Sequence, residues 1–106
     1  MSNFRIKEKS EILDKVKVYL DDMLIPRTVP GYVYLVEVIC YRYLYDPAAS
    51  LIEACMVMSK NTSITAAAYK SAIVHSINLA NETRAERDLP KVNPKEIING
   101  CVSVLL

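Results

Sequence analysis

SITAAAYKSAIVHSINLAN, residues 63–81, is the stretch of this chain that predicts both a packing face and an outer surface. At about 100° per residue, one stripe of a helix here carries apolar groups: Ala66, Tyr69, Ile73, Ile77 and Ala80. The opposite side carries Ile64, Ala67, Ala68, Ser71, His75 and Asn78. We therefore expect a helix that packs through the first set and faces outward through the second.

This stretch has one full charge, Lys70. A helix that grips DNA phosphates and guanine edges usually carries several Arg or Lys residues. The predicted outer face therefore carries less positive charge than a helix that binds DNA usually does.

Length and charge limit the possible functions. With 106 residues, the chain has the size of one domain with a single modest core. Its net charge is +1 and 52% of its residues are hydrophobic, so no overall basic field attracts it to nucleic acid or to acidic membranes. Between Pro47 and Asn81 the only charged residues are Glu53, Lys60 and Lys70. The middle third is therefore expected to be core or interface.

The cysteines and the apolar segments predict a cytoplasmic protein without a metal or cofactor. Cys40, Cys55 and Cys101 lie in apolar runs with no CxxC or Cys/His zinc spacing, so we expect buried thiols in a reducing compartment. The N-terminus lacks the apolar run of a signal peptide. The most apolar segment, residues 29–45, is interrupted by two charges, so no membrane span is expected.

The helical pattern predicts an all-α fold. We expect a compact domain of five to six helices over residues 10–106, after an N-terminal tail of residues 1–9. Ser10 is a suitable N-cap for a first helix that ends near Leu24. A second helix is predicted from Pro30 to about Tyr45. Because that helix is apolar nearly all round, it should be the central, buried one.

The remaining helices are predicted from their capping signals. Asp46-Pro47 opens a third helix over Ala48 to about Met58. A polar cluster follows, in which Thr62 or Ser63 caps the fourth helix. Two helices joined by so short a turn are a candidate helix-turn-helix. Residues 81–92 are expected to be a polar loop. A last helix is predicted to start after it, with Asn93 as the N-cap, Pro94 at the first helical position and Glu96 at the third.

Other polar and aromatic residues have structural explanations. Glu37 and Arg42 on the second helix are expected to cap or bridge neighbouring helices. The five tyrosines of that helix are expected to pack in the core with their hydroxyls near the surface, with an aromatic ligand site as the alternative. Four basic residues near the predicted polar loop are offset by acidic neighbours, so a solvated segment is expected: Arg84, Arg87, Lys91 and Lys95.

Three segments resemble one protein family. Residues 30–39, PGYVYLVEVI, resemble the GYxYLxEAI segment of the C-terminal effector domain of sporulation response regulators, the stage-zero sporulation protein A family. Residues 72–80, AIVHSINLA, resemble its AIRHAIEVA stretch, and residues 91–98, KVNPKEII, resemble its KPTNSEFI entry to the last helix. With a short deletion near residues 46–50, the resemblance covers the chain from about residue 10 to its end.

The resemblance implies a helix-turn-helix whose second helix enters the major groove, and a role in transcriptional control. The family's recognition helix reads TTASRVERAIRH, and its polar positions fall here on Ala68, Lys70, Ser71 and Val74. Three arginines are thus replaced, and a glutamate has become lysine. Because one bidentate Arg–guanine pair is worth about 1–3 kcal/mol of discrimination, we expect that this helix does not recognise the family's DNA site.

Two further departures concern the surroundings of that helix. The family's YPxIA segment before the turn is replaced by residues 55–59, CMVMS, so the core there is rebuilt. The family also places this domain after a phosphoacceptor receiver domain, and nothing before Ser10 has the length of one. We therefore expect that the chain does not sense phosphorylation by itself.

The first functional interpretation is a stand-alone DNA-binding transcriptional regulator with altered or weakened specificity. Hydroxyl, amide and basic groups would hold phosphates while two alanine methyls contact thymine. The expected DNA contacts are Lys60, Asn61, Thr62, Ser63, Thr65, Ala67, Ala68, Lys70, Ser71 and His75. A homodimer, or a heterodimer with a related regulator, would offset weak binding to a single half-site.

The second interpretation is a relative that does not recognise DNA and acts by protein contact, for instance by pairing with or antagonising a full-length regulator. The near-neutral charge and the small apolar residues expected on the outward face favour this interpretation, because such residues are typical of an interface: Ile64, Ala67, Ala68 and Val74. An enzyme is not expected, because His75 has no paired carboxylate on its face and the chain has neither a nucleophile motif nor a glycine-rich phosphate loop.

Overall fold

The structure, a computed structural model, describes the backbone of residues 2–106 and the side chains of residues 9–106. It contains five helices: α1 (Ser2–Asp22), α2 (Pro30–Leu44), α3 (Leu51–Ser59), α4 (Ala66–Glu86) and α5 (Pro94–Leu105). No strand occurs within residues 2–106, so the predicted all-α class is confirmed.

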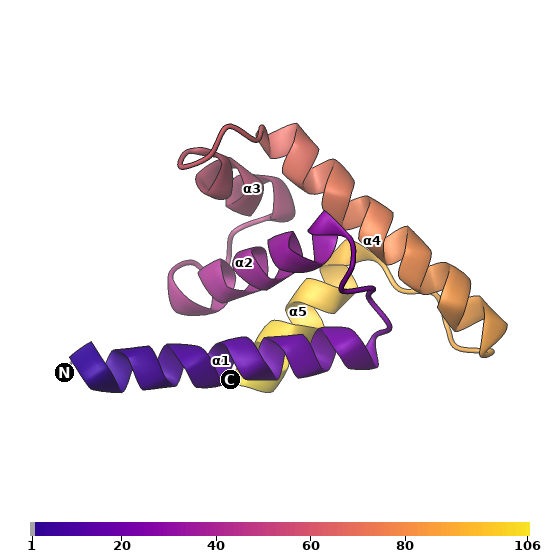
Figure 1. Cartoon of the computed structure of the whole chain (residues 1–106), viewed down its shortest axis with the longest axis horizontal. Helices are drawn as coiled ribbons and strands as arrows, with labels where there is room; N and C mark the ends of the chain where they lie inside the picture. Colours follow the sequence, from indigo (N-terminus) through magenta and orange to yellow (C-terminus); the bar gives the residue numbers. More distant parts are fainter. Residues whose placement is uncertain (1) are drawn as a thin grey trace.

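The predicted central position of α2 is also confirmed. This helix contacts each of the other four, and α1 and α3 lie on opposite sides of it (Figure 1). The first half of α4 packs against α2 and α3, whereas its second half extends away from the body of the molecule. α5 runs between α4 and α1 and contacts α2 on the way.

One hydrophobic core joins all five helices. The periodicity of α1 buries Ile12, Val16 and Leu20, as predicted from its apolar spacing. The other helices contribute Leu35, Val38, Ile39, Ala54, Cys55, Tyr69, Ile73, Ile77, Ile97, Ile98 and Cys101, all of them buried. Because each helix supplies part of this cluster, the position of one helix depends on the others.

A close helix crossing brings α2 against α4 at Gly31. A Cβ atom added to Gly31 would lie 2.7 Å from the Cβ of Ser76 and would overlap the carbonyl oxygen of Ala72. Ser76 is fully buried, and its hydroxyl donates to the carbonyl of Ile73 at 2.7 Å. Since no other residue lacks a side chain, glycine alone allows the two backbones to come this close.

A polar cluster joins the end of α1 to the start of α2. The guanidinium of Arg27 donates to both carboxylate oxygens of Asp21, at 3.0 and 2.6 Å, and the Tyr32 hydroxyl donates to the same carboxylate at 3.0 Å. The hydrogen bonds from Arg27 hold the pKa of the Asp21 carboxyl below its usual value. The cluster therefore fixes the turn between the two helices at neutral pH.

α1 begins earlier than predicted. Its backbone is helical from Ser2, and Ser10 is an exposed residue inside the helix, so the predicted Ser10 cap is wrong. Residues 2–10 contain no proline or glycine, and nothing in this segment interrupts a helix. The predicted end near Leu24 agrees with the observed end at Asp22, after which Leu24 adopts a φ of 68°.

α3 begins one turn later than predicted. The Ser50 hydroxyl accepts from the amide of Glu53, and the Glu53 carboxylate accepts from the amide of Ser50, each at 3.2 Å. This capping box starts the helix after Ser50. Asp46 instead accepts from the amide of Ala48 at 3.3 Å within a turn, so the predicted Asp46-Pro47 start is wrong.

α4 also differs at both ends. Thr65 caps it by accepting from the amide of Ala68 at 3.1 Å, so the predicted caps at Thr62 and Ser63 are wrong. The helix continues past Asn81 to Glu86, through residues that form helices readily. The predicted loop over residues 81–92 is therefore wrong in its first half.

The segment after α4 folds back along the helix. Asn81 exchanges two hydrogen bonds with the backbone of Val92, at 2.8 and 2.9 Å, and the Nε atom of Arg84 donates to the carbonyl of Pro90 at 2.8 Å. Arg84 is only 7% exposed, so its predicted place in a solvated loop is wrong. The other three basic residues of that prediction are exposed, as expected: Arg87, Lys91 and Lys95.

α5 starts as predicted. Asn93 accepts from the amide of Glu96 at 2.9 Å and donates to its carboxylate at 2.5 Å, with Pro94 in the first turn. The apolar face expected for this helix is buried through Ile97, Ile98, Cys101 and Val102.

We expect Gly31→Ala to lower the free energy of unfolding by about 2–3 kcal/mol, because the new methyl group meets a backbone carbonyl that cannot move away. Gly100→Ala is the matched control. The methyl group there meets only the hydroxyl end of the half-exposed Tyr19 side chain, and alanine is a better helix former, so we expect a change below about 1 kcal/mol. Urea denaturation of both variants measures the difference. Equal effects would contradict the close crossing at Gly31.

Candidate functional site

The residues predicted to contact DNA lie on the surface formed by α3, α4 and the turn between them. All of them are exposed: Lys60, Asn61, Thr62, Ser63, Thr65, Ala67, Ala68, Lys70, Ser71 and His75. We call this set the α4 outer face. Its members come from the turn that follows α3 and from the first half of α4, and α3 and α4 pack directly against each other.

The packing side of α4 matches its sequence pattern. Tyr69, Ile73, Ile77 and Ala80 are buried, as predicted, and Ala66 is half-buried. The ring of Tyr69 lies against that of Tyr34 on α2, with a distance of 4.3 Å between the ring centroids. These contacts hold the opposite side of the helix toward solvent.

One residue assigned to the outward side by its spacing is placed differently. Ile64 is half-buried and packs against the core cluster. It precedes the first residue of α4, so the helical count does not apply to it.

Hydrogen bonds within the turn occupy part of its polar surface. The Thr62 hydroxyl accepts from the amide of Ile64 at 3.2 Å and donates to the carbonyl of the same residue at 3.4 Å. The Thr65 hydroxyl accepts from Ala68 as the helix cap, which leaves its own proton available to a further acceptor. The turn is thus ordered by its own side chains.

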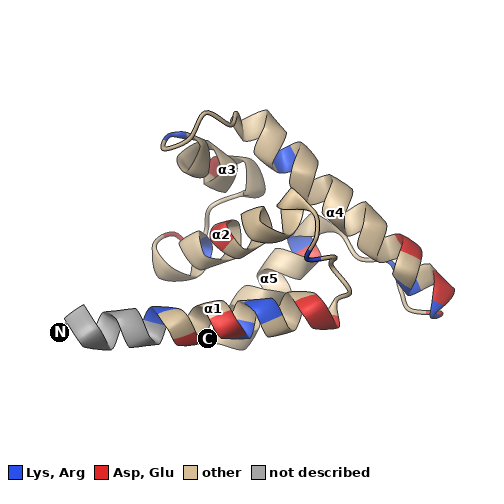
Figure 2. Cartoon of the chain, in the orientation of Figure 1, with Lys and Arg blue, Asp and Glu red and all other residues tan. Residues whose placement is uncertain are grey.

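Charge is divided unequally along α4. In Figure 2 the first half of the helix is almost free of charged residues, whereas acidic and basic residues both gather at its far end. Lys60 and Lys70 are the charged members of the α4 outer face, and Glu82, Glu86 and Asp88 lie at the other end of the helix or just beyond it. The partial positive charge at the start of α4 adds to that of the two lysines.

The outer face includes a shallow hollow of about 580 Å³. It is bordered by α3 on one side and α4 on the other, and its lining residues are Ile52, Ala67, Lys70, Ser71, Val74, His75 and Asn78. Ile52 is 42% exposed, and Met56, one helical turn further along α3, is 53% exposed. The hollow is therefore lined by both apolar and hydrogen-bonding groups.

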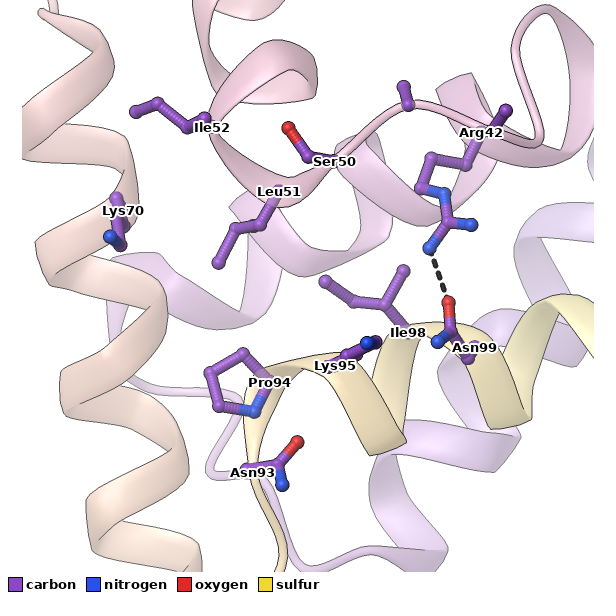
Figure 3. Close-up of a pocket in the computed structure, with 12 residues that line it drawn as sticks. Arg42, Ser50, Leu51, Ile52, Lys70, Asn93, Pro94, Lys95, Ile98 and Asn99 are labelled. Carbon is purple, nitrogen blue, oxygen red and sulfur yellow. Dashed lines mark hydrogen bonds between the residues drawn. The ribbon is translucent and has the colours of Figure 1, made fainter.

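A larger cleft of about 750 Å³ lies beside the hollow, between the segment after α2, the start of α3, α4 and the start of α5 (Figure 3). Arg42 donates to the side-chain oxygen of Asn99 on α5 at 2.6 Å and to the carbonyl of Pro47 at 2.5 Å. The predicted bridging role of Arg42 is thereby confirmed. The cleft itself was not predicted, because its walls come from segments far apart in the sequence.

The predicted burial of the thiols is largely confirmed. All three cysteines are free; Cys55 and Cys101 are buried, and Cys40 is half-buried. Burial raises the pKa of the Cys101 thiol to about 12, with a further contribution from Cys40, so this thiol is protonated at neutral pH. Burial likewise raises the pKa of the Glu37 carboxyl on α2.

Among the residues with described side chains, no group of three or more His, Cys, Asp or Glu residues is placed to hold a metal ion. Over residues 2–106, every helix is too short or too polar to cross a membrane.

Comparisons with models of known protein families, with curated proteins and with solved structures give no match. The resemblance to the sporulation effector domain therefore stays a prediction from three sequence segments.

We expect Thr65→Ala to lower the free energy of unfolding by about 1 kcal/mol, because it removes the cap of α4. Ser63→Ala, in the same exposed turn, is the matched control and should change stability by less than about 0.5 kcal/mol. Thermal denaturation followed by circular dichroism compares the two. A larger loss in the Ser63 variant would place the start of α4 where the sequence predicts it.

Proposed function

We propose that this chain is a DNA-binding regulator that places the α4 outer face in the major groove, with α3 and α4 as the two helices of a helix-turn-helix. The observation that supports this most directly is the exposure of every predicted contact residue on one surface. None of these residues is a carboxylate, so none of them repels the phosphate backbone. The carboxylates of α4, Glu82 and Glu86, lie at the other end of the helix.

The available groups determine how such binding would work. Lys60 and Lys70 provide charge for phosphates, and the Thr65 hydroxyl keeps a free proton for a phosphate oxygen. Ser71 and His75 lie about one turn apart on the same face and offer hydrogen-bonding groups to base edges. Two or three phosphate contacts give a weak, salt-dependent complex, so useful affinity requires two copies on adjacent half-sites.

The same groups limit specificity. The face has no arginine, so it lacks the side chain that most often recognises guanine through a bidentate pair. The exposed methyl groups of Ala67 and Ala68 suit contact with the thymine methyl. We therefore expect a preference for A·T-rich major-groove sequence over the G·C positions that arginines select.

We expect micromolar binding to an A·T-rich duplex at low salt, with a log–log salt slope of about −2 to −3 for each bound copy. Lys70→Ala should weaken binding severalfold and reduce the magnitude of that slope by about 1, because one phosphate contact is lost. His75→Ala should weaken binding without changing the slope if its imidazole contacts a base. Fluorescence anisotropy of labelled duplexes at two salt concentrations measures both quantities.

Lys15→Ala is the matched control, since Lys15 is an exposed lysine on α1, outside the α4 outer face. It should leave affinity and slope unchanged. Absence of binding to any duplex at low salt would exclude the proposal. Equal losses in the Lys15 and Lys70 variants would show instead that α4 is not the contacting helix.

A second candidate is protein contact through the same side of the molecule. The exposed Ile52 on α3 lines the hollow together with small residues of α4, and the exposed Met56 lies one helical turn further along α3, so the two extend an apolar strip from the hollow. A strip of this kind suits a second copy of the chain or a related regulator.

If the strip is a contact surface, Met56→Glu should shift the chain from dimer to monomer while leaving it folded, because Met56 is an exposed residue. Light scattering across a concentration series measures the molecular mass. Val33→Glu on α2 provides a control at a similarly exposed apolar position. A wild-type chain that stays monomeric at high concentration would exclude self-association through this strip.

A further inference from the structure

We propose that the cleft between the start of α3, α4 and the start of α5 binds a small organic anion, with a carboxylate held by basic side chains and an aliphatic body held against its floor (Figure 3). This site is separate from the α4 outer face except for Lys70, which borders both.

The size of the cleft suits a small molecule. Its volume of about 750 Å³ lies within the range of roughly 300–1,000 Å³ that is usual for ligand pockets. Four separate segments form its walls, so a ligand there is enclosed from several directions. Arg42 ties two of these segments together, because it links α2 to α5 and to the loop that follows α2.

The floor of the cleft is aliphatic. Leu51 from α3 and Ile98 from α5 lie at its centre in Figure 3, and Ile52 lies at the edge nearest α4. Ile98 is only 1% exposed, so the core fixes its position beneath the cleft, whereas Ile52 is exposed and offers its free surface to a ligand. Burial of an acyl chain against such side chains is favourable by the hydrophobic effect.

The charge that surrounds this floor is positive. Arg42, Lys70 and Lys95 come from three different helices, and Lys70 lies across the cleft from Arg42. The lining residues include no carboxylate. Glu53 and Glu96 are on the two helices that begin at the cleft, but each is engaged in capping its own helix. The cleft therefore offers a ligand carboxylate cations on more than one side and no lining anion.

Arg42 provides an independent observation in favour of an anion. Both of its hydrogen-bond partners, Asn99 and the carbonyl of Pro47, are neutral. Its Nε atom is buried and has no hydrogen-bond partner among the described residues. Arg42 has no ion-pair partner among the described residues, so a ligand carboxylate in the cleft would supply the counter-charge that its guanidinium lacks.

Titration of the isotopically labelled full chain with sodium octanoate, followed by two-dimensional NMR, tests the proposal. We expect saturable shifts in the amides of residues 50–52 and 95–99, with a dissociation constant on the order of 1 mM. Acetate supplies the charge alone and 1-hexanol supplies the apolar body alone. Each should bind at least about tenfold more weakly than octanoate, because each loses one half of the interaction.

Substitutions at exposed residues test the basic side chains and the aliphatic floor of the cleft separately, and they should leave the chain folded. Lys70→Ala and Lys95→Ala should each weaken octanoate binding about threefold, whereas Lys15→Ala on α1 should not change it. Ile52→Ser should weaken octanoate binding and leave the response to acetate unchanged.

Three results would overturn the proposal. These are no saturable shift with octanoate, shifts confined to another surface such as that around Val18 and Val104, or equal affinities in the wild-type chain and both cleft lysine variants. The titration contains no DNA, so its outcome is independent of whether the α4 outer face binds a duplex.

Discussion

The contact between Gly31 and the backbone of α4 determines how the rest of this structure is arranged. A side chain at Gly31 would overlap the carbonyl oxygen of Ala72, so α2 and α4 cross at a distance that only glycine permits. This crossing presses Tyr69 and Ile73 into the core and turns the opposite side of α4 outward. α3 then covers the first half of α4, and α5 fills the space that α2, α4 and α1 leave. The exposed face and the cleft both follow from this crossing.

Its consequence for function is that α4 presents a fixed surface with little charge. The packed half of the helix supplies rigidity, while the outward half supplies small side chains, hydroxyls and one lysine. A surface of this kind gains little from phosphate attraction and lacks the bidentate pairs that give high discrimination. Binding to DNA or to a protein would therefore depend on shape and on the number of copies engaged.

Periodicity predicted the existence of the helices and their buried stripes, because burial repeats with the helical turn. The stripe of Tyr69, Ile73 and Ile77 and the central place of α2 are examples. Helix starts were predicted less well, since several neighbouring residues have equal capping chemistry. Asp46 and Ser50 are both suitable N-caps by residue type. In the structure the N-cap of α3 is Ser50, because Glu53 lies three residues later and completes the capping box.

Contacts between segments far apart in the chain could not be predicted from the local sequence pattern. Arg84 has the sequence neighbourhood of a solvated residue, yet it is buried because the segment before α5 folds back over it. The cleft likewise needs α3, α4 and α5 together. The side-chain partner of Arg42, Asn99, is far from it in the sequence, so the sequence predicted a bridging role for Arg42 but no partner.

Lys70 connects the two proposed activities. It borders both the hollow of the α4 outer face and the cleft, and it is the only charged residue in the stretch 63–81. One ammonium group cannot pair fully with a ligand carboxylate and with a DNA phosphate at the same time. Linkage requires that each partner then lowers the affinity of the other by the same factor. Because a partly exposed ion pair contributes about 0.2–1 kcal/mol, this coupling through Lys70 alone is limited to a few fold.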